Sequence, residues 1–167
     1  MFTLVDFGLD NVRYSSADWA DYDNDGDLDV LISGNTTAVT KLYRNDGTTF
    51  VDAAAGLPGV NRGRAAWGDY DGDNDLDLLL LGYTGSARIS RVYRNDGATF
   101  TDISAALVDV NRPGADWGDF DNDGDLDILL SGNMNAGDTT EVFRNDGGGT
   151  FVGIGAGLPS FNEGYAE

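Results

Sequence analysis

The chain has 167 residues, no cysteine, no histidine and a formal net charge of −19. The lack of cysteine excludes disulfides, thiol nucleophiles and thiolate metal sites, and the lack of histidine removes the commonest general base and the commonest transition-metal ligand. No apolar run approaches the roughly 18 residues of a membrane span, so we expect no membrane insertion. Length and composition suit a single domain over residues 1–167.

The acidic residues are concentrated in three stretches, which contain 15 of the 29 aspartates and glutamates. The rest of the chain has 14 acidic residues against 10 basic ones. The negative charge therefore belongs to three local segments, and without a basic patch we expect no nucleic-acid partner.

Three internal repeats organise the chain. Trp19, Trp67 and Trp117 are 48 and 50 residues apart, and each is followed by a related segment: "YRNDGTTF", "YRNDGATF" or "FRNDGGGTF". The repeats cover approximately residues 2–49, 50–99 and 100–150, with a partial repeat at 151–167. The two ends of the chain, 2–18 and 151–167, are thus equivalent segments.

Each repeat predicts four short strands, seen most clearly in the second. "RAAWGDY" (64–70) is the first strand, and "LDLLLLG" (76–82) is a nearly continuous apolar run typical of a strand buried on both faces. "SRVYR" (90–94) follows, then the tight-turn sequence "NDG" and a fourth strand in "TFTDIS" (99–104). We predict an all-β fold of β-propeller blades: three four-stranded meanders plus one extra outer strand. A β-sandwich built from the same module is the alternative.

The aspartates of the first acidic stretch have the spacing of a cation-binding loop. In "DYDNDGDLD" (21–29), carboxylates stand at positions 1, 3, 5 and 9, with a glycine at position 6 that permits a sharp turn. An all-oxygen ligand set without histidine or cysteine favours Ca²⁺ over zinc or copper. An EF-hand would need a glutamate at position 12, where this chain has Ile32.

These motifs resemble FG-GAP/VCBS repeats, the blades of integrin-α-type β-propellers. "WADYDNDGDLDVLISG", "WGDYDGDNDLDLLLLG" and "WGDFDNDGDLDILLSG" are similar to that family's Ca²⁺ loop between the first two strands of a blade, and "YRNDG" fits the VCBS version. The resemblance covers essentially the whole chain. It implies three Ca²⁺ sites, one per repeat.

Carried over by position, the implied side-chain ligands form three sets: Asp21, Asp23, Asp25 and Asp29; Asp69, Asp71, Asp73 and Asp77; and Asp119, Asp121, Asp123 and Asp127. The backbone carbonyls of Asp27, Asp75 and Asp125 would complete the sites. The second loop departs from the pattern at Asn74, where the others have glycine. Asparagine tolerates a left-handed backbone, so we expect a site there too, with weaker binding.

Other recurrent residues have structural interpretations. We expect the three tryptophans to pack between blades, and Arg44, Arg94 and Arg144 to tie each blade to its neighbour. Because the acidic loop and the "NDG" turn share one end of the meander, we expect a ligand at the opposite end. The predicted polar contacts there are Asn61, Arg62, Asn111 and Arg112.

The resemblance implies adhesion or recognition of proteins and glycans outside cells. The leading hypothesis is therefore a calcium-binding extracellular or cell-surface module, with any signal sequence outside this chain. One alternative is an engineered or structural self-assembling fragment without a ligand. A propeller lyase or hydrolase is a further alternative, but we predict no enzyme, because no acid pair outside the loops has convincing spacing.

Closure of the propeller is a separate problem. Closed propellers use four or more blades, and an arc of three exposes apolar faces and strand edges. We therefore expect a homo-oligomer, with a dimer favoured, unless the chain is part of a longer protein.

Overall fold

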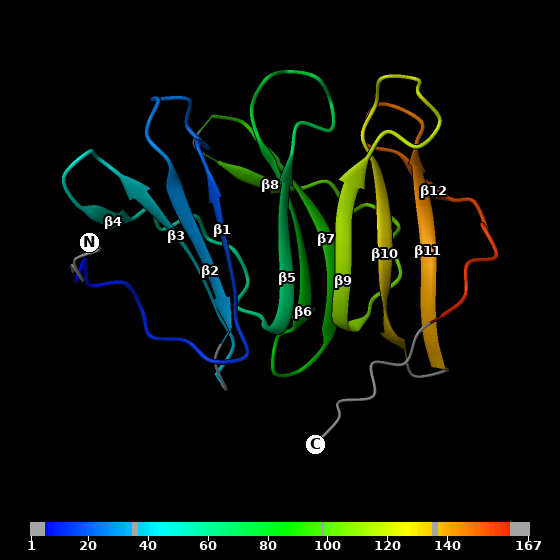
Figure 1. The fold of residues 1–167 in the computed structure, drawn as a ribbon, viewed down its shortest axis with the longest axis horizontal. Helices are drawn as coiled ribbons and strands as arrows, with labels where there is room; N and C mark the ends of the chain where they lie inside the picture. The colour runs from blue at the N-terminus through cyan, green and yellow to red at the C-terminus, as the bar shows by residue number, and fades with distance from the viewer. Residues whose placement is uncertain (1–5, 35–36, 98, 135–136, 161–167) are drawn as a thin grey trace, which may run out of the picture.

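The computed structural model describes residues 6–34, 37–97, 99–134 and 137–160. Within these residues the chain forms twelve strands and no helix. The strands make three antiparallel sheets, each of four strands paired in chain order. Figure 1 shows the sheets side by side, and we call them blades 1, 2 and 3.

The strands of blade 1 are β1 (Ser16–Ala20), β2 (Asp29–Gly34), β3 (Val39–Asn45) and β4 (Phe50–Asp52). Those of blade 2 are β5 (Asn61–Gly68), β6 (Asp77–Tyr83), β7 (Arg88–Asn95) and β8 (Phe100–Asp102). Those of blade 3 are β9 (Asn111–Gly118), β10 (Asp127–Met134), β11 (Gly137–Asn145) and β12 (Phe151–Gly153).

The meander predicted from the sequence is confirmed. The strand predicted at Phe151 is β12, which pairs with β11 as the fourth strand of blade 3, so the described residues contain three sheets of four strands and no additional one. Its counterpart at the N-terminal end, around Phe2, lies outside the described residues. The fold class is all-β, with propeller-type blades.

Apolar side chains of consecutive blades pack against one another to form the core. Leu78 and Leu80 of β6 belong to the cluster shared with blade 1, whereas Leu79 and Leu81 belong to the cluster shared with blade 3. Successive residues of a strand point to opposite faces of the sheet. The continuous apolar run of the second strand is thus explained by burial on both faces.

The first face of blade 1 is covered by the segment that precedes β1. Val30, Ile32 and Tyr43 form a small cluster there, and Leu9 and Val12 pack against it. Leu9 and Val12 stand where Leu57 and Val60 stand before blade 2, so this segment takes the place of an inter-blade connection.

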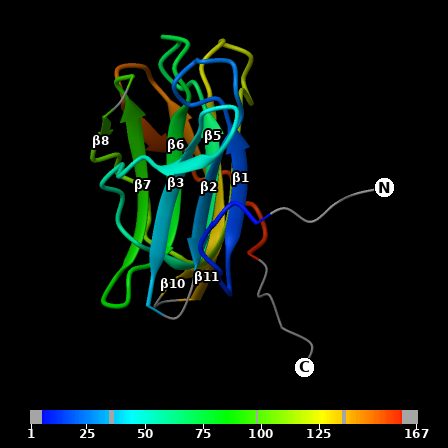
Figure 2. The same ribbon diagram turned by 90° about the vertical axis from the view of Figure 1, so that its left-hand side faces the viewer.

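The two ends of the blades carry different kinds of loop. The loops that follow β1, β5 and β9, which contain the clustered aspartates, lie together at the upper end of the molecule in Figures 1 and 2. The connections from β6 to β7 and from blade to blade reach the lower end. The acidic loops and the variable loops therefore lie at opposite ends, as the meander predicts.

Replacing Leu79 tests the packing between blades. Because its side chain is fully buried between blades 2 and 3, we expect Leu79→Ala to lower the free energy of unfolding by about 2–5 kcal/mol. Val152→Ala, on the exposed side of an outer strand, should change it by less than about 1 kcal/mol. Urea unfolding followed by tryptophan fluorescence measures both. Equal losses would contradict this packing.

Candidate metal centre

Each acidic loop brings three carboxylates together at the end of a blade. In every repeat the group comprises loop positions 1, 3 and 9, whose nearest oxygens all lie within 4.8 Å of one another. The groups are Asp21, Asp23 and Asp29; Asp69, Asp71 and Asp77; and Asp119, Asp121 and Asp127. Three sets of aspartates, one per repeat, could therefore hold a metal ion.

The ninth residue of each loop is a buried anchor at the start of the second strand. Asp77 is fully buried, and its two carboxylate oxygens accept backbone N–H bonds from Tyr70 at 3.0 Å and Asn95 at 2.8 Å. Asp29 and Asp127 accept the equivalent pairs of bonds. One carboxylate thus joins the acidic loop to the turn between the third and fourth strands.

The first residue of each loop shapes the turn. Its carboxylate accepts the backbone N–H of the sixth residue, as in the bond from Gly26 to Asp21 at 3.0 Å. Asn74 and Gly124 donate the equivalent bonds in the other loops. Asn74 adopts the left-handed backbone that the sequence requires at this position, with φ of 74°, so the second loop folds like the others despite lacking the glycine.

The fifth residue of each loop does not join the carboxylate group in this structure. Asp25 instead accepts the backbone N–H of Asp27 at 2.9 Å, and Asp73 and Asp123 accept the same bond two residues on. The carboxylates of Asp27, Asp75 and Asp125 are also outside the three groups formed by the described residues. The role predicted for the fifth residue and for the carbonyl of the seventh stays a prediction.

The donor set fits a cation. Asp21 Oδ1 and Asp23 Oδ1 are buried without a hydrogen-bond partner, and a buried acceptor without a partner is costly. Burial, followed by the charge of Asp73, raises the pKa of Asp71, and burial raises the pKa of Asp77 to about 7. A divalent cation would supply the missing contacts and offset the repulsion between these carboxylates.

An asparagine that the sequence analysis assigned only to a turn ties the blades together. Asn95 donates from Nδ2 to the carbonyl of Tyr22 in blade 1 at 2.7 Å, and Asn145 donates to that of Tyr70 in blade 2 at 2.9 Å. Each also donates to its own acidic loop, at the carbonyl of the residue before the ninth position. The recurrence of asparagine before Asp-Gly in every repeat could have indicated this role, but the preference of asparagine for turns was a sufficient explanation of the recurrence.

The arginines before that asparagine do not have the predicted role. Arg94 and Arg144 pair with Asp96 and Asp146, two residues further on in the same turn. The prediction that they tie a blade to its neighbour was wrong, because a short turn brings a closer carboxylate within their reach.

The opposite end of the molecule has a cavity between blades 2 and 3. Its volume is about 790 Å³, and its lining includes Asn61, Arg62 and Asn111, three of the four residues predicted for the ligand face. The fourth, Arg112, is next to Asn111 in the chain but is not among the described residues that line the cavity.

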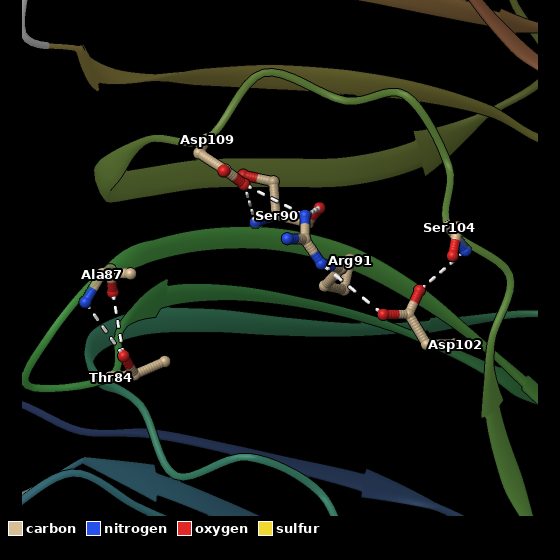
Figure 3. Close-up of polar contacts among 7 residues, drawn as sticks. All are labelled: Thr84, Ala87, Ser90, Arg91, Asp102, Ser104 and Asp109. Atoms are coloured by element: carbon tan, nitrogen blue, oxygen red, sulfur yellow. Dashed lines mark hydrogen bonds and ion pairs between the residues drawn. The ribbon is translucent and has the colours of Figure 1, made fainter.

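The cavity wall contains a carboxylate held in a fixed position. Asp109 lines the cavity and accepts the backbone N–H of Ser90 at 2.9 Å. Arg91 contacts it at 3.1 Å and also pairs with Asp102, whose other oxygen caps the N–H of Ser104 (Figure 3). A tight loop closed by bonds between Thr84 and Ala87 supports the adjoining wall.

Comparison with known proteins assigns the repeats. The model of the family described as "FG-GAP-like repeat" matches residues 21–80 and 69–130, which together cover more than half of the chain. The chain belongs to the FG-GAP-like repeat family. Both matches start at an acidic loop and run into the apolar strand of the next repeat.

A lectin from Agrocybe aegerita, described as specifically recognising non-reducing terminal N-acetylglucosamine, has a solved structure with a similar fold. The TM-score is 0.53 at 23% sequence identity, over 82% of this chain and 37% of the lectin chain. The FG-GAP chain thus spans little more than a third of the lectin's length. Comparison with curated proteins gave no match.

The described part of the chain contains no helix long and apolar enough to cross a membrane.

The raised pKa of Asp77 predicts how stability depends on pH when metal is removed. Its pKa is about 7 in the fold against 3.8 ordinarily, so the proton favours the folded state, and this contribution is lost as pH rises through 7. In EGTA we expect the melting temperature to fall between about pH 5 and pH 8. Thermal unfolding by circular dichroism measures the slope.

Asp77→Asn is the matched variant for this slope, because an amide does not titrate. We expect a flatter dependence on pH in EGTA than for the unmodified chain. A melting temperature that rises over the same range in the unmodified chain would contradict the assignment.

Proposed function

We propose that the chain is a calcium-stabilised, propeller-type domain over residues 1–167 that acts outside cells as a binding module for glycan or protein partners. The observation that carries the calcium assignment is the recurrence of three aspartate groups made of oxygen donors alone. Carboxylates in a flexible loop favour Ca²⁺ over Mg²⁺, which demands nearly ideal octahedral geometry. Extracellular calcium reaches the concentrations at which such modules bind it.

The metal is proposed to be structural. Each aspartate group is formed by a tight loop, and its ninth residue is bonded to the backbone on both carboxylate oxygens. A cation that binds only the folded loops stabilises the fold by mass action. The unpartnered oxygens of Asp21 and Asp23 support this role, because the cation replaces contacts that the protein does not provide.

The binding function is proposed for the cavity between blades 2 and 3. It combines the amides of Asn61 and Asn111, the oriented carboxylate of Asp109 and the ring of Tyr83, and sugars are bound by such combinations of directional polar groups and an aromatic face. The similar fold of a lectin supports a glycan as the first class to test. The role of Arg112 in this face remains part of the proposal.

A binding module is preferred to an enzyme. Asp109, a carboxylate that lines the cavity, is already paired with Arg91, which also contacts Asp102. We also propose that the chain works as a homodimer. An assembly fragment without a ligand is the second candidate function, favoured by the close similarity of the repeats.

Calcium removal tests the metal assignment. If the dissociation constants lie near 10⁻⁴ M, about 10 mM Ca²⁺ should stabilise the fold by about 2.7 kcal/mol per site. Differential scanning calorimetry in Ca²⁺, in the same concentration of Mg²⁺ and in EGTA should show a large rise for Ca²⁺ alone. Asp71→Asn should reduce the rise, whereas Asp138→Asn, outside the loops, should preserve it. Equal melting temperatures in Ca²⁺ and EGTA would refute the assignment.

Arg62 tests the cavity. On a glycan array that includes terminal N-acetylglucosamine, we expect binding by the unmodified chain and a loss of at least about tenfold in affinity for Arg62→Ala, equivalent to about 1.4 kcal/mol. Arg13→Ala is the control, because Arg13 is exposed in the segment before blade 1 and lies outside the cavity lining. Equal affinities of Arg62→Ala and the unmodified chain would exclude this cavity as the site.

A further inference from the structure

The contacts between neighbouring blades follow one pattern, which occurs twice within the chain. The second strand of the earlier blade contributes a leucine to the interface, Leu31 or Leu79, and both are buried. The asparagine of the later blade donates to the carbonyl of an aromatic residue in the earlier blade's acidic loop, Tyr22 or Tyr70. Both tyrosine side chains are also buried.

The tryptophan of blade 3 adds a third contact, which has this form only between blades 2 and 3: between blades 1 and 2 the indole Nε1 of Trp67 is buried without a hydrogen-bond partner, and Ala20 stands in place of the glycine. Trp117 donates from Nε1 to the carbonyl of Ala66 at 3.2 Å and stacks on the ring of Tyr70. Its indole lies so close to Gly68 that a Cβ there would be 2.7 Å from the ring. The earlier blade thus offers a glycine where the indole of the later blade sits.

Blade 3 presents the same surface, and the structure places none of the described residues of another blade on it. Leu129, the equivalent of Leu79, is 46% exposed, against 0% for Leu79. Phe120, the equivalent of Tyr70, is 48% exposed, against 4% for Tyr70. A Cβ on Gly118, the equivalent of Gly68, would meet nothing within 4 Å. The site for a following tryptophan is therefore open.

Blade 1 presents the complementary groups. Trp19 is 60% exposed, the highest value among the large hydrophobic residues that the structure describes. Asn45 donates from Nδ2 to Leu28 of its own acidic loop at 3.1 Å, whereas Asn95 and Asn145 each also donate to a preceding blade.

Building on the homodimer of the proposed function, we propose that the open face of blade 3 binds blade 1 of a second copy of this chain, and that two copies joined by two such contacts close into one ring. In each contact Trp19 of one copy lies over Gly118 of the other, and Asn45 donates to the carbonyl of Phe120. A second copy is the occupant because the open face of blade 3 lacks an indole and an asparagine side chain, and blade 1 of the same chain presents both in Trp19 and Asn45.

Two further features suit this pairing. Asn24 of the first acidic loop donates to Asp75 of the next loop at 2.7 Å. Asn122 occupies the equivalent place in the third loop with a similar positive φ. We expect it to donate to Asp27 of a second copy in the same way. Leu9 and Val12 already fill the place of an inter-blade connection before blade 1. Leu158 is the equivalent of Leu9 after blade 3 and is 41% exposed. The proposed contact does not need it, because Leu9 of the second copy takes its place.

Contacts between unlike faces form rings or open filaments, depending on whether the rotation closes. Light scattering and sedimentation of the purified full chain in Ca²⁺, with no ligand added, measure the outcome. We expect twice the mass of one chain. A monomer at concentrations of about 100 μM, or a filament, would overturn the proposal. The measurement needs no ligand, so a dimer that binds no glycan would contradict only the proposed binding function.

Leu129→Asp tests the face, because it places a charge at a position that is already partly exposed in the single chain. We expect a folded monomer by circular dichroism. Val152→Asp is the matched control: this residue and its equivalent Val51 are exposed on the outer strands of both end blades, so the control should remain a dimer. A dimeric Leu129→Asp chain would overturn the proposed face.

Mixing two variants tests the direction of the contact. Trp19→Ala alters the blade 1 face and Leu129→Asp alters the blade 3 face. In a homodimer of either variant, both contacts therefore contain one altered face. In a mixture, the intact blade 3 of the first variant meets the intact blade 1 of the second, so one contact is restored and a heterodimer should form. Native mass spectrometry with one chain isotopically labelled distinguishes it from either homodimer. If both variants are folded but form no heterodimer when mixed, the proposed pairing of blade 3 with blade 1 is wrong.

Discussion

The structure depends on one buried carboxylate in each repeat. Asp29, Asp77 and Asp127 begin the second strands, and each accepts backbone N–H bonds from the acidic loop and from the turn after the third strand. Removing such a group from water is costly unless hydrogen bonds or a charge compensate. The two N–H groups provide part of this compensation, and the raised pKa of Asp77 shows that they do not complete it.

The same carboxylate couples the metal site to the packing of the blades. The residue that donates a backbone N–H to Asp77 is Asn95, and the side chain of Asn95 donates to blade 1. A displacement of the acidic loop would therefore alter both the hairpin turn and the contact with the preceding blade. A cation in one loop would stabilise more than the loop itself. This coupling gives a physical reason for an acidic loop in every repeat of a fold that has no disulfide.

The arrangement also places the clustered carboxylates and the cavity at opposite ends of the molecule. The carboxylates that repel one another lie at one end, where a cation can offset them, and the cavity lies at the other end. Loops at the cavity end differ between the repeats, while the acidic loops at the other end are nearly the same. Changes in the cavity loops can alter a binding surface at little cost to the scaffold.

The sequence by itself determined the repeat, the four strands of each blade and the loops that gather the aspartates, because these follow from local patterns of apolar residues, turn residues and charge. It also determined which end of each blade carries the variable loops. Only the tertiary structure decided that Asn95 and Asn145, and not Arg94 and Arg144, join the blades, because both residue types suit a turn and the distance to the neighbouring carbonyl depends on how the blades pack. It also decided that Leu129 is exposed while Leu79 is buried: the two strands read alike, and they differ only in whether another blade lies beside them.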